Sequence, residues 1–268
     1  MIGRARQNPE RGSVFVLRQV FPAYTEDMTL IRIDKLLADC GLGTRSEVKN
    51  IIKAGRVCVD GEVVKDAGFK AESTAAVTVD GRSIIHEAYQ YFMLNKPKGV
   101  VSATEDKKEK TVIELITEEK RRDLFPVGRL DKDTTGLLLI TNDGALANRL
   151  LSPGKHVKKE YIAKLDMPVD EQLKRRLAEG FKEGLDIGDD KPTEPAEIEL
   201  ISEDEAKVVI SEGRYHQVKR MFACFDRTVT ELKRISMGSL VLDEGLAEGE
   251  YRRLSEEEKN SLSLSGNN

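Results

Sequence analysis

Residues 125–144 read FPVGRLDKDTTGLLLITNDG and carry the clearest local pattern in the chain. A proline and a glycine interrupt the first half, which is therefore predicted to be a loop. The apolar run from Gly136 to Thr141 predicts a buried strand, and the Asn142-Asp-Gly sequence predicts a turn after it. Asp131 thus lies in a loop at the mouth of a buried strand, where a carboxylate can act on a substrate. The alternative is a structural role, in which Asp131 caps backbone amides.

The same loop also fits a motif of aspartate-nucleophile phosphatases. Asp131-Lys-Asp-Thr-Thr matches their Asp-x-Asp-x-Thr pattern, in which the first aspartate attacks phosphorus and Asp133 would serve as acid and base. That motif follows a buried parallel strand, whereas here the apolar strand comes after Asp131. A phosphatase is therefore disfavoured.

The surrounding sequence predicts strands and helices without a regular β-α-β alternation. Strands are expected at 91–95, 159–165, 196–201 and 206–210, and helices at 111–115, 145–151, 170–180 and 216–225. We therefore predict an α+β fold for residues 89–262, with a mixed, mostly antiparallel sheet and flanking helices.

A smaller α+β module is predicted at residues 28–88. Apolar residues recur at helical spacing over 33–40 and over 44–54, and each run ends at a glycine, Gly41 and Gly55. Two strand–turn–strand patterns follow, and their turns are Asp60-Gly61 and Asp80-Gly81. Residues 1–27 are expected to form a flexible extension, or else an extra strand and turn, and residues 263–268 a disordered tail.

The charges of the chain are segregated. The net charge of −4 does not indicate a nucleic-acid-binding protein, but residues 32–56 hold six basic and three acidic residues. Arg45, Lys49 and Lys53 are spaced by four and share one helix face, which could equally be an ordinary solvated surface. By contrast, residues 243–258 hold seven acidic residues and two arginines.

The overall composition favours a reducing, cytoplasmic setting. The three cysteines are scattered and offer neither metal-ligand spacing nor a disulfide framework. No apolar run reaches the length of a membrane span, so we expect no membrane partner. The scattered cysteines lead us to expect no metal site. We also expect a monomer.

Residues 30–85 resemble the small RNA-binding module first described in a ribosomal small-subunit protein. The matching runs are RIDKLL from Arg32, GTRSEV from Gly43 and IKAGRVCVDG from Ile52. The resemblance implies that the basic residues here include phosphate contacts, which position RNA without reading its sequence. These residues are Arg32, Lys35, Arg45, Lys49, Lys53 and Arg56.

Four further motifs resemble those of pseudouridine synthases. They are NKPKG from Asn95, the run at 125–144, KKEY from Lys158 and EGRYHQVKRMF from Glu212. Because the RNA-binding module precedes them, the chain resembles the RsuA family, which acts on ribosomal RNA.

This resemblance implies roles for four residues. Asp131 matches the family's essential aspartate, and Tyr161 matches the tyrosine that stacks on the target uracil. Lys219 matches the basic residue that pairs with the aspartate and would favour its ionised form. Arg129 matches an arginine that helps hold the base out of its helix. Without the resemblance, Tyr161 could be an ordinary strand aromatic and Lys219 part of a solvated helix face.

The implied reaction converts uridine to pseudouridine in ribosomal RNA, free or in a partly assembled small subunit. It gains and loses no atoms, so we expect no cofactor. The run from His216 to Phe222 and the later MGSL from Met237 favour small-subunit (16S) RNA, because large-subunit relatives tend to carry arginine in place of Lys219. Two alternatives remain: a large-subunit synthase of the same family, and an RNA-binding assembly factor without catalysis.

Overall fold

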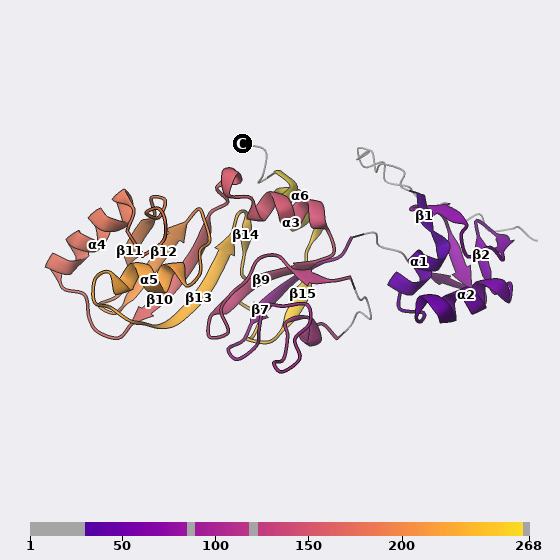
Figure 1. Ribbon diagram of the computed structural model, residues 1–268, viewed down its shortest axis with the longest axis horizontal. Coiled ribbons are helices and arrows are strands. Elements are labelled where there is room, and N and C mark those ends of the chain that lie inside the picture. The colour runs from indigo at the N-terminus through magenta and orange to yellow at the C-terminus, as the bar shows by residue number, and fades with distance from the viewer. Residues whose placement is uncertain (1–29, 85–88, 118–122, 265–268) are drawn as a thin grey trace, which may run out of the picture.

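The chain forms two bodies (Figure 1). The smaller body encloses one hydrophobic core, and the larger body has one on each face of its sheet. The computed structural model describes residues 30–84, 89–117 and 123–264. The predicted extension at 1–27 and the predicted domain boundary at residue 88 lie outside the described residues.

In its described residues, 30–84, the smaller body contains two helices and six short strands. Thr44 caps the second helix in a capping box with Glu47, so this helix begins where the sequence predicts. The elements are β1 (Leu30–Arg32), α1 (Ile33–Asp39), α2 (Arg45–Lys53), β2 (Val57–Val59), β3 (Glu62–Val64), β4 (Lys70–Glu72), β5 (Val77–Val79) and β6 (Arg82–Ile84).

Both predicted hairpins are present in this body. Asp60 and Gly61 turn the chain between β2 and β3, and both have positive φ angles of 50° and 88°. Asp80 and Gly81 do the same between β5 and β6. The sheet order is β3-β2-β5-β6, while β1 pairs with β4. Together with α1 and α2, these strands enclose a core that includes Ile33 and Ile52.

The larger body is built on a nine-stranded sheet with the order β11-β12-β10-β13-β9-β7-β15, to which β14 and β8 add at β13 and β9. Its strands are β7 (Tyr91–Lys96), β8 (Phe125–Pro126), β9 (Thr135–Thr141), β10 (Lys159–Leu165), β11 (Glu197–Leu200), β12 (Glu205–Ile210), β13 (Val229–Met237), β14 (Leu240–Val241) and β15 (Tyr251–Arg253). Its helices are η1 (Ile113–Leu115), α3 (Gly144–Leu151), η2 (Pro153–Lys155), α4 (Glu171–Glu183), α5 (Gln217–Ala223) and α6 (Glu256–Leu264).

Helices cover both faces of this sheet, so its interior strand β9 is buried along its whole length. Successive strand residues point to opposite faces. Leu138 and Ile140 accordingly join the core under α4 and α5, while Leu137 and Leu139 join the core under α3 and α6. In the part of the chain that the structure describes, no helix is both long and apolar enough to cross a membrane.

The pairing of β13 with β9 is parallel, and every other pairing between described strands is antiparallel. The predicted α+β fold with a mixed, mostly antiparallel sheet is therefore confirmed. At this junction Gly136 has a φ angle of 97°, and a Cβ atom there would lie 2.2 Å from the carbonyl oxygen of Arg234. Glycine is thus required for the two strands to meet.

Several local predictions were wrong. The helix predicted at 111–115 is a single 3₁₀ turn, because Thr111 pairs with Val101 and its amide donates to the Glu114 carboxylate. The predicted loop before Asp131 contains the two-residue edge strand β8. The long strand β13 was not predicted at all. Helix α6 extends to Leu264, so the predicted tail begins inside a helix.

Candidate active site

A cleft of about 1180 Å³ lies beside the loop that precedes β9. Residues 128–134, the start of β10 and the segment that joins β12 to α5 line it. Three of the predicted site residues, Arg129, Asp131 and Tyr161, are among the lining side chains. Lys219 contacts Asp131 from α5. The fold therefore gathers all four predicted residues around one cavity.

Asp131 has two basic neighbours. Lys219 lies in α5, and His216 is the N-terminal cap of that helix. The Oδ2 atom of Asp131 lies 3.3 Å from Nζ of Lys219, and its Oδ1 atom lies 3.5 Å from Nε2 of His216. Lys219 also donates to Oδ1 of Asp133 at 2.6 Å. The Lys219 ammonium holds the pKa of the Asp133 carboxyl below its usual range. Lys219 is thus shared between two carboxylates, which the sequence did not predict.

This arrangement does not fit the phosphatase alternative. The strand before Asp131 is β8, which has two residues and pairs antiparallel with β9. The second aspartate of the motif, Asp133, is paired with an ammonium group. Among the described residues, no group of three or more His, Cys, Asp or Glu side chains is placed to hold a metal ion.

The buried side chain of Lys96 fixes the backbone on one side of Asp131. Lys96 ends β7 and is fully buried, and its ammonium donates to the carbonyl oxygens of Pro97, Lys132 and Thr134 at 3.0, 3.4 and 2.9 Å. Burial lowers the pKa of Lys96 to about 8, although Asp133 and Asp131 oppose that shift. Lys96 belongs to the NKPKG motif that starts at Asn95. The sequence did not predict that the Lys96 ammonium holds the backbone of the Asp131 loop.

Ser102 fixes the other side of the same loop. Its hydroxyl donates to the carbonyl oxygen of Leu130 at 2.9 Å and accepts from the Leu130 amide at 3.1 Å. Leu130 directly precedes Asp131. Because both of its backbone groups are held, the carboxylate is presented from a rigid loop.

Tyr161 lies both in the hydrophobic core and at the cleft. It is 7% exposed. It lies in β10 between Val208 of β12 and Arg234 of β13. Arg129, by contrast, is exposed at the cleft.

Two buried cations lie in the cleft beside Tyr161, and neither was predicted. Nε of Arg234 donates to the carbonyl oxygen of Leu137, and Nζ of Lys159 donates to that of Val157. Burial, followed by the nearby Arg234, lowers the pKa of Lys159 to about 8. Both side chains point to the cleft because they share a sheet face with Tyr161.

The cleft wall formed by the segment between β12 and α5 is held by a polar network centred on Glu212. Its carboxylate accepts from Nε of Arg214 at 2.8 Å and from Nε2 of Gln217 at 2.9 Å. Arg214 also donates to the carbonyl oxygens of Lys191 and Pro192. The segment that leads into α5 is therefore a well-supported loop.

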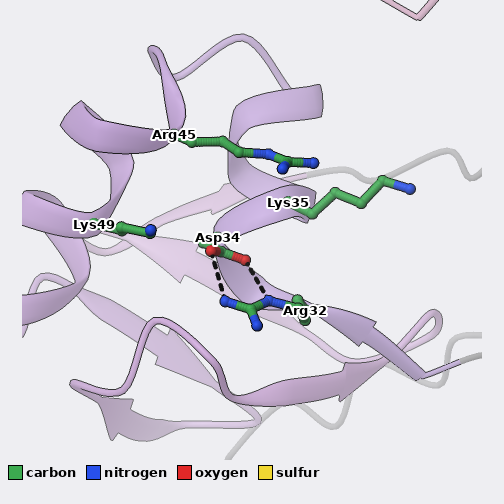
Figure 2. A pocket seen from close by; sticks show the side chains of 5 residues that line it. All are labelled: Arg32, Asp34, Lys35, Arg45 and Lys49. Atoms are coloured by element: carbon green, nitrogen blue, oxygen red, sulfur yellow. Dashed lines mark hydrogen bonds and ion pairs between the residues drawn. The ribbon is translucent and has the colours of Figure 1, made fainter.

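A second pocket, of about 340 Å³, lies between α1 and α2 in the smaller body (Figure 2). Asp34 is buried and accepts two hydrogen bonds from the Arg32 guanidinium, at 3.0 and 2.9 Å. Lys35 comes from α1, and Arg45 and Lys49 come from α2. The pocket thus presents four cations around one carboxylate.

The pocket gathers four of the six predicted RNA-binding residues, namely Arg32, Lys35, Arg45 and Lys49. Lys53 is exposed at the end of α2, outside the pocket lining. Arg56 is paired with Asp80 across the sheet, with Nε 2.8 Å from Oδ1. The sequence did not predict a role for Asp34. The available signal was a carboxylate between the apolar residues Ile33 and Leu36 of a predicted helix.

Comparison with known proteins agrees with these two bodies. A family model described as RNA pseudouridylate synthase matches residues 90–224, and an S4 domain model matches residues 31–77. An Escherichia coli K12 protein named ribosomal small subunit pseudouridine synthase A is 42% identical over 85% of this chain and 98% of its own length. A Bacillus subtilis protein described as an uncharacterized RNA pseudouridine synthase, YtzG, is 47% identical over 87% of this chain and 98% of its own.

A solved structure gives the same result. A crystal structure of a pseudouridylate synthase aligns with a TM-score of 0.60 and 39% identity, and covers 87% of this chain and 99% of that chain. The chain belongs to the RNA pseudouridine synthase family and carries an N-terminal S4 domain. The resemblance noted in the sequence is thereby confirmed.

Proposed function

We propose that this protein converts a uridine of small-subunit ribosomal RNA into pseudouridine, with Asp131 as the reacting carboxylate. The observation that carries the proposal is the Asp131–Lys219 ion pair, whose carboxylate lines the cleft that Tyr161 also lines. This chain matches nearly the full length of the relatives that are named small-subunit synthases. That similarity supports small-subunit RNA as the substrate.

The proposed reaction breaks the nitrogen–carbon glycosidic bond, turns the uracil over and joins it to the sugar through carbon. Every atom of the substrate is kept, so the reaction balances without a redox partner or an energy source. An ionised Asp131 can attack the anomeric carbon, stabilise positive charge on it, or remove a neighbouring proton. In each case Lys219 places a positive charge 3.3 Å from this carboxylate.

In this proposal Tyr161 holds the detached uracil by stacking. A stack tolerates rotation of the base, whereas a directional hydrogen bond would resist it. The base must first leave its helix, which costs roughly a few kcal/mol. The exposed cation Arg129 is suited to occupy the place that the base leaves, and so to offset part of that cost.

The S4 domain supplies affinity for RNA in this proposal. Arg32, Lys35, Arg45 and Lys49 line one pocket and present a local positive charge despite the net charge of the chain. Phosphate contacts of this kind hold RNA without reading its bases. We propose that the protein acts as a monomer, because one chain contributes both the RNA-binding pocket and the cleft.

The direct test is a map of new pseudouridines. The protein is incubated separately with small-subunit ribosomal RNA, with large-subunit ribosomal RNA and with partly assembled small subunits, and pseudouridines are located by carbodiimide-stop sequencing. We expect one new site in small-subunit RNA. A site in large-subunit RNA alone would reassign the substrate, and binding without any new site would indicate an assembly factor.

Replacement of Lys96 with methionine is expected to lower kcat by roughly 10- to 100-fold with little change in RNA affinity, because small displacements of a reacting group are costly. The change removes the ammonium that donates to the carbonyl oxygens of Lys132 and Thr134, and the Lys132 carbonyl keeps only the Gly99 amide as a donor. Steady-state kinetics, RNA binding and the melting temperature separate this positioning effect from unfolding. Lys110→Met is the control, since Lys110 is an exposed lysine outside the cleft. Equal kcat values for the two variants would show that Lys96 does not position the loop.

Replacement of Lys49 with alanine is expected to flatten the salt dependence of RNA affinity by roughly one unit in a plot of log affinity against log salt. Lys49 lines the S4 pocket, whereas Lys53, one turn later on α2, does not. Lys53→Ala removes the same charge from the same helix and should change the slope less. Filter-binding titrations at salt concentrations from about 50 to about 300 mM measure both slopes. Affinity that depends on phosphate contacts falls steeply over this range. A Lys49→Ala slope equal to that of the wild-type protein would exclude the pocket as the contact surface.

A further inference from the structure

Tyr215 is the most exposed large hydrophobic side chain in the described residues. It is 76% exposed, although it lines the cleft next to His216. The other aromatic side chain there, Tyr161, is 7% exposed and contributes to the core. The ring of Tyr215 contributes no comparable burial, so packing within the chain does not explain its presence.

The ring is nevertheless held in one place. It stacks on the imidazole of His216, with ring centroids 3.8 Å apart and an interplanar angle of 17°. The carbonyl oxygen of Tyr215 accepts from Nη1 of Arg220 at 3.1 Å. His216 has a left-handed backbone (φ 50°) at the N-cap of α5, which fixes the direction of the stacked pair. One face of Tyr215 therefore covers His216, and a stacking surface remains exposed.

The stacked pair is adjacent to the proposed reacting group. Nε2 of His216 lies 3.5 Å from Oδ1 of Asp131. A ring that stacks on the outer face of Tyr215 would thus be separated from Asp131 by the tyrosine and the imidazole. A uridine that reacts at Asp131 has its neighbouring nucleotide within reach of that surface.

The surroundings of Tyr215 suit a nucleotide. The exposed cations Lys98 and Arg129 line the same cleft and can meet phosphate groups. Its chain neighbours Arg214 and His216 are both polar. Single-stranded RNA is commonly held by aromatic side chains on which unpaired bases stack.

We propose that Tyr215 is a stacking platform for an unpaired nucleobase that directly flanks the target uridine. The proposal rests on the proposed function, and it specifies the substrate further as an RNA whose target has an unstacked neighbour. Because every base has an aromatic face, the platform selects an exposed neighbour rather than a particular base.

The test uses a fragment of small-subunit RNA that contains the mapped uridine, with 2-aminopurine placed in turn on each side of it. We expect the wild-type protein to change the fluorescence at one of the two positions. Tyr215→Ala should abolish this change and raise KM about 10-fold, with a smaller effect on kcat, as for the loss of one stacked base. Tyr215→Trp and Tyr215→Phe should restore both the fluorescence change and most of the affinity, because they retain an aromatic face.

Tyr89→Ala is the matched control. Tyr89 is 54% exposed and lies outside the cleft lining, so its replacement should leave KM unchanged. An abasic neighbour should cost the wild-type protein the same factor as Tyr215→Ala, with no further loss when the two changes are combined.

Two outcomes separate this inference from the proposed function. If the wild-type protein modifies the fragment but Tyr215→Ala has an unchanged KM and an unchanged fluorescence response, Tyr215 is not the platform. If the mapping finds no modified uridine, the proposed function fails, and 2-aminopurine is then placed at the unpaired positions of a small-subunit RNA segment that the wild-type protein binds. The fluorescence and affinity of the Tyr215 variants still decide the stacking in that case.

Discussion

Replacement of Asp131 with asparagine is expected to lower pseudouridine formation by roughly 1000-fold or more, while RNA affinity stays within a few-fold of the wild-type value. Asparagine keeps the shape of the side chain but removes the charge, and a neutral amide can neither attack the anomeric carbon nor stabilise positive charge there. The binding pocket of the S4 domain is unchanged by this replacement. Single-turnover kinetics with saturating protein measure the chemical step separately from binding.

Asp133→Asn provides the matched control in the same loop. Asp133 also contacts Lys219, at 2.6 Å, but its side chain is 70% exposed, whereas that of Asp131 is 27% exposed. We expect a loss of roughly tenfold or less, because Lys219 keeps Asp131 as a partner. If Asp133→Asn were the inactive variant and Asp131→Asn the active one, the reacting carboxylate would be Asp133. Magnesium-dependent hydrolysis of a simple phosphoester that is lost in Asp133→Asn would bring back the phosphatase alternative.

Replacement of Gly136 with alanine is expected to destabilise the larger body by roughly 3 kcal/mol or more, or to prevent it from folding. The new Cβ atom would lie 2.2 Å from the carbonyl oxygen of Arg234 and 2.8 Å from its amide nitrogen, and both are backbone atoms that no rotamer change can move. The φ angle of 97° adds strain for any L-residue with a side chain. Denaturant unfolding followed by circular dichroism measures the change.

Gly144→Ala is the control for this change. Gly144 begins α3, and a Cβ atom there would have no neighbour within 4 Å. Alanine favours the helix over glycine by up to about 1 kcal/mol, so this variant should be as stable as the wild type or slightly more stable. Similar unfolding free energies for the two variants would mean that β9 and β13 do not meet as described.

The sequence predicts best the elements that local chemistry determines. The two Asp-Gly turns, the capped start of α2 and the apolar run of β9 each follow from a few neighbouring residues. Strand β13 was missed because Glu231, Lys233 and Arg234 hide its alternation, and Arg234 is buried even though it is charged. Nothing near residue 234 reveals that its backbone meets Gly136, about a hundred residues earlier in the chain.

The candidate site shows the same limit. The resemblance to a family picked out Asp131, Tyr161 and Lys219, and the fold brings them together at one cleft. It could not show that Lys219 is shared with Asp133, because that depends on how α5 approaches the loop. Lys96 looks like an ordinary polar residue at a strand end, yet it is fully buried, since the carbonyl oxygens around it come from a loop some 36 residues later. A role that depends on such distant contacts leaves no local signal.

The position of β13 has a consequence for biosynthesis. This strand lies between β10 and β9 in the middle of the sheet, although it is among the last strands to be translated. Until residue 237 has left the ribosome, one edge of β10 has no partner strand, and Thr135 and Gly136 lack their partners on the edge of β9 away from β7. Unpaired edges of this kind promote association with other chains. A nascent chain that stalls before β13 would therefore be prone to aggregate, and a chaperone that covers strand edges would benefit it most in the interval between residues 165 and 237.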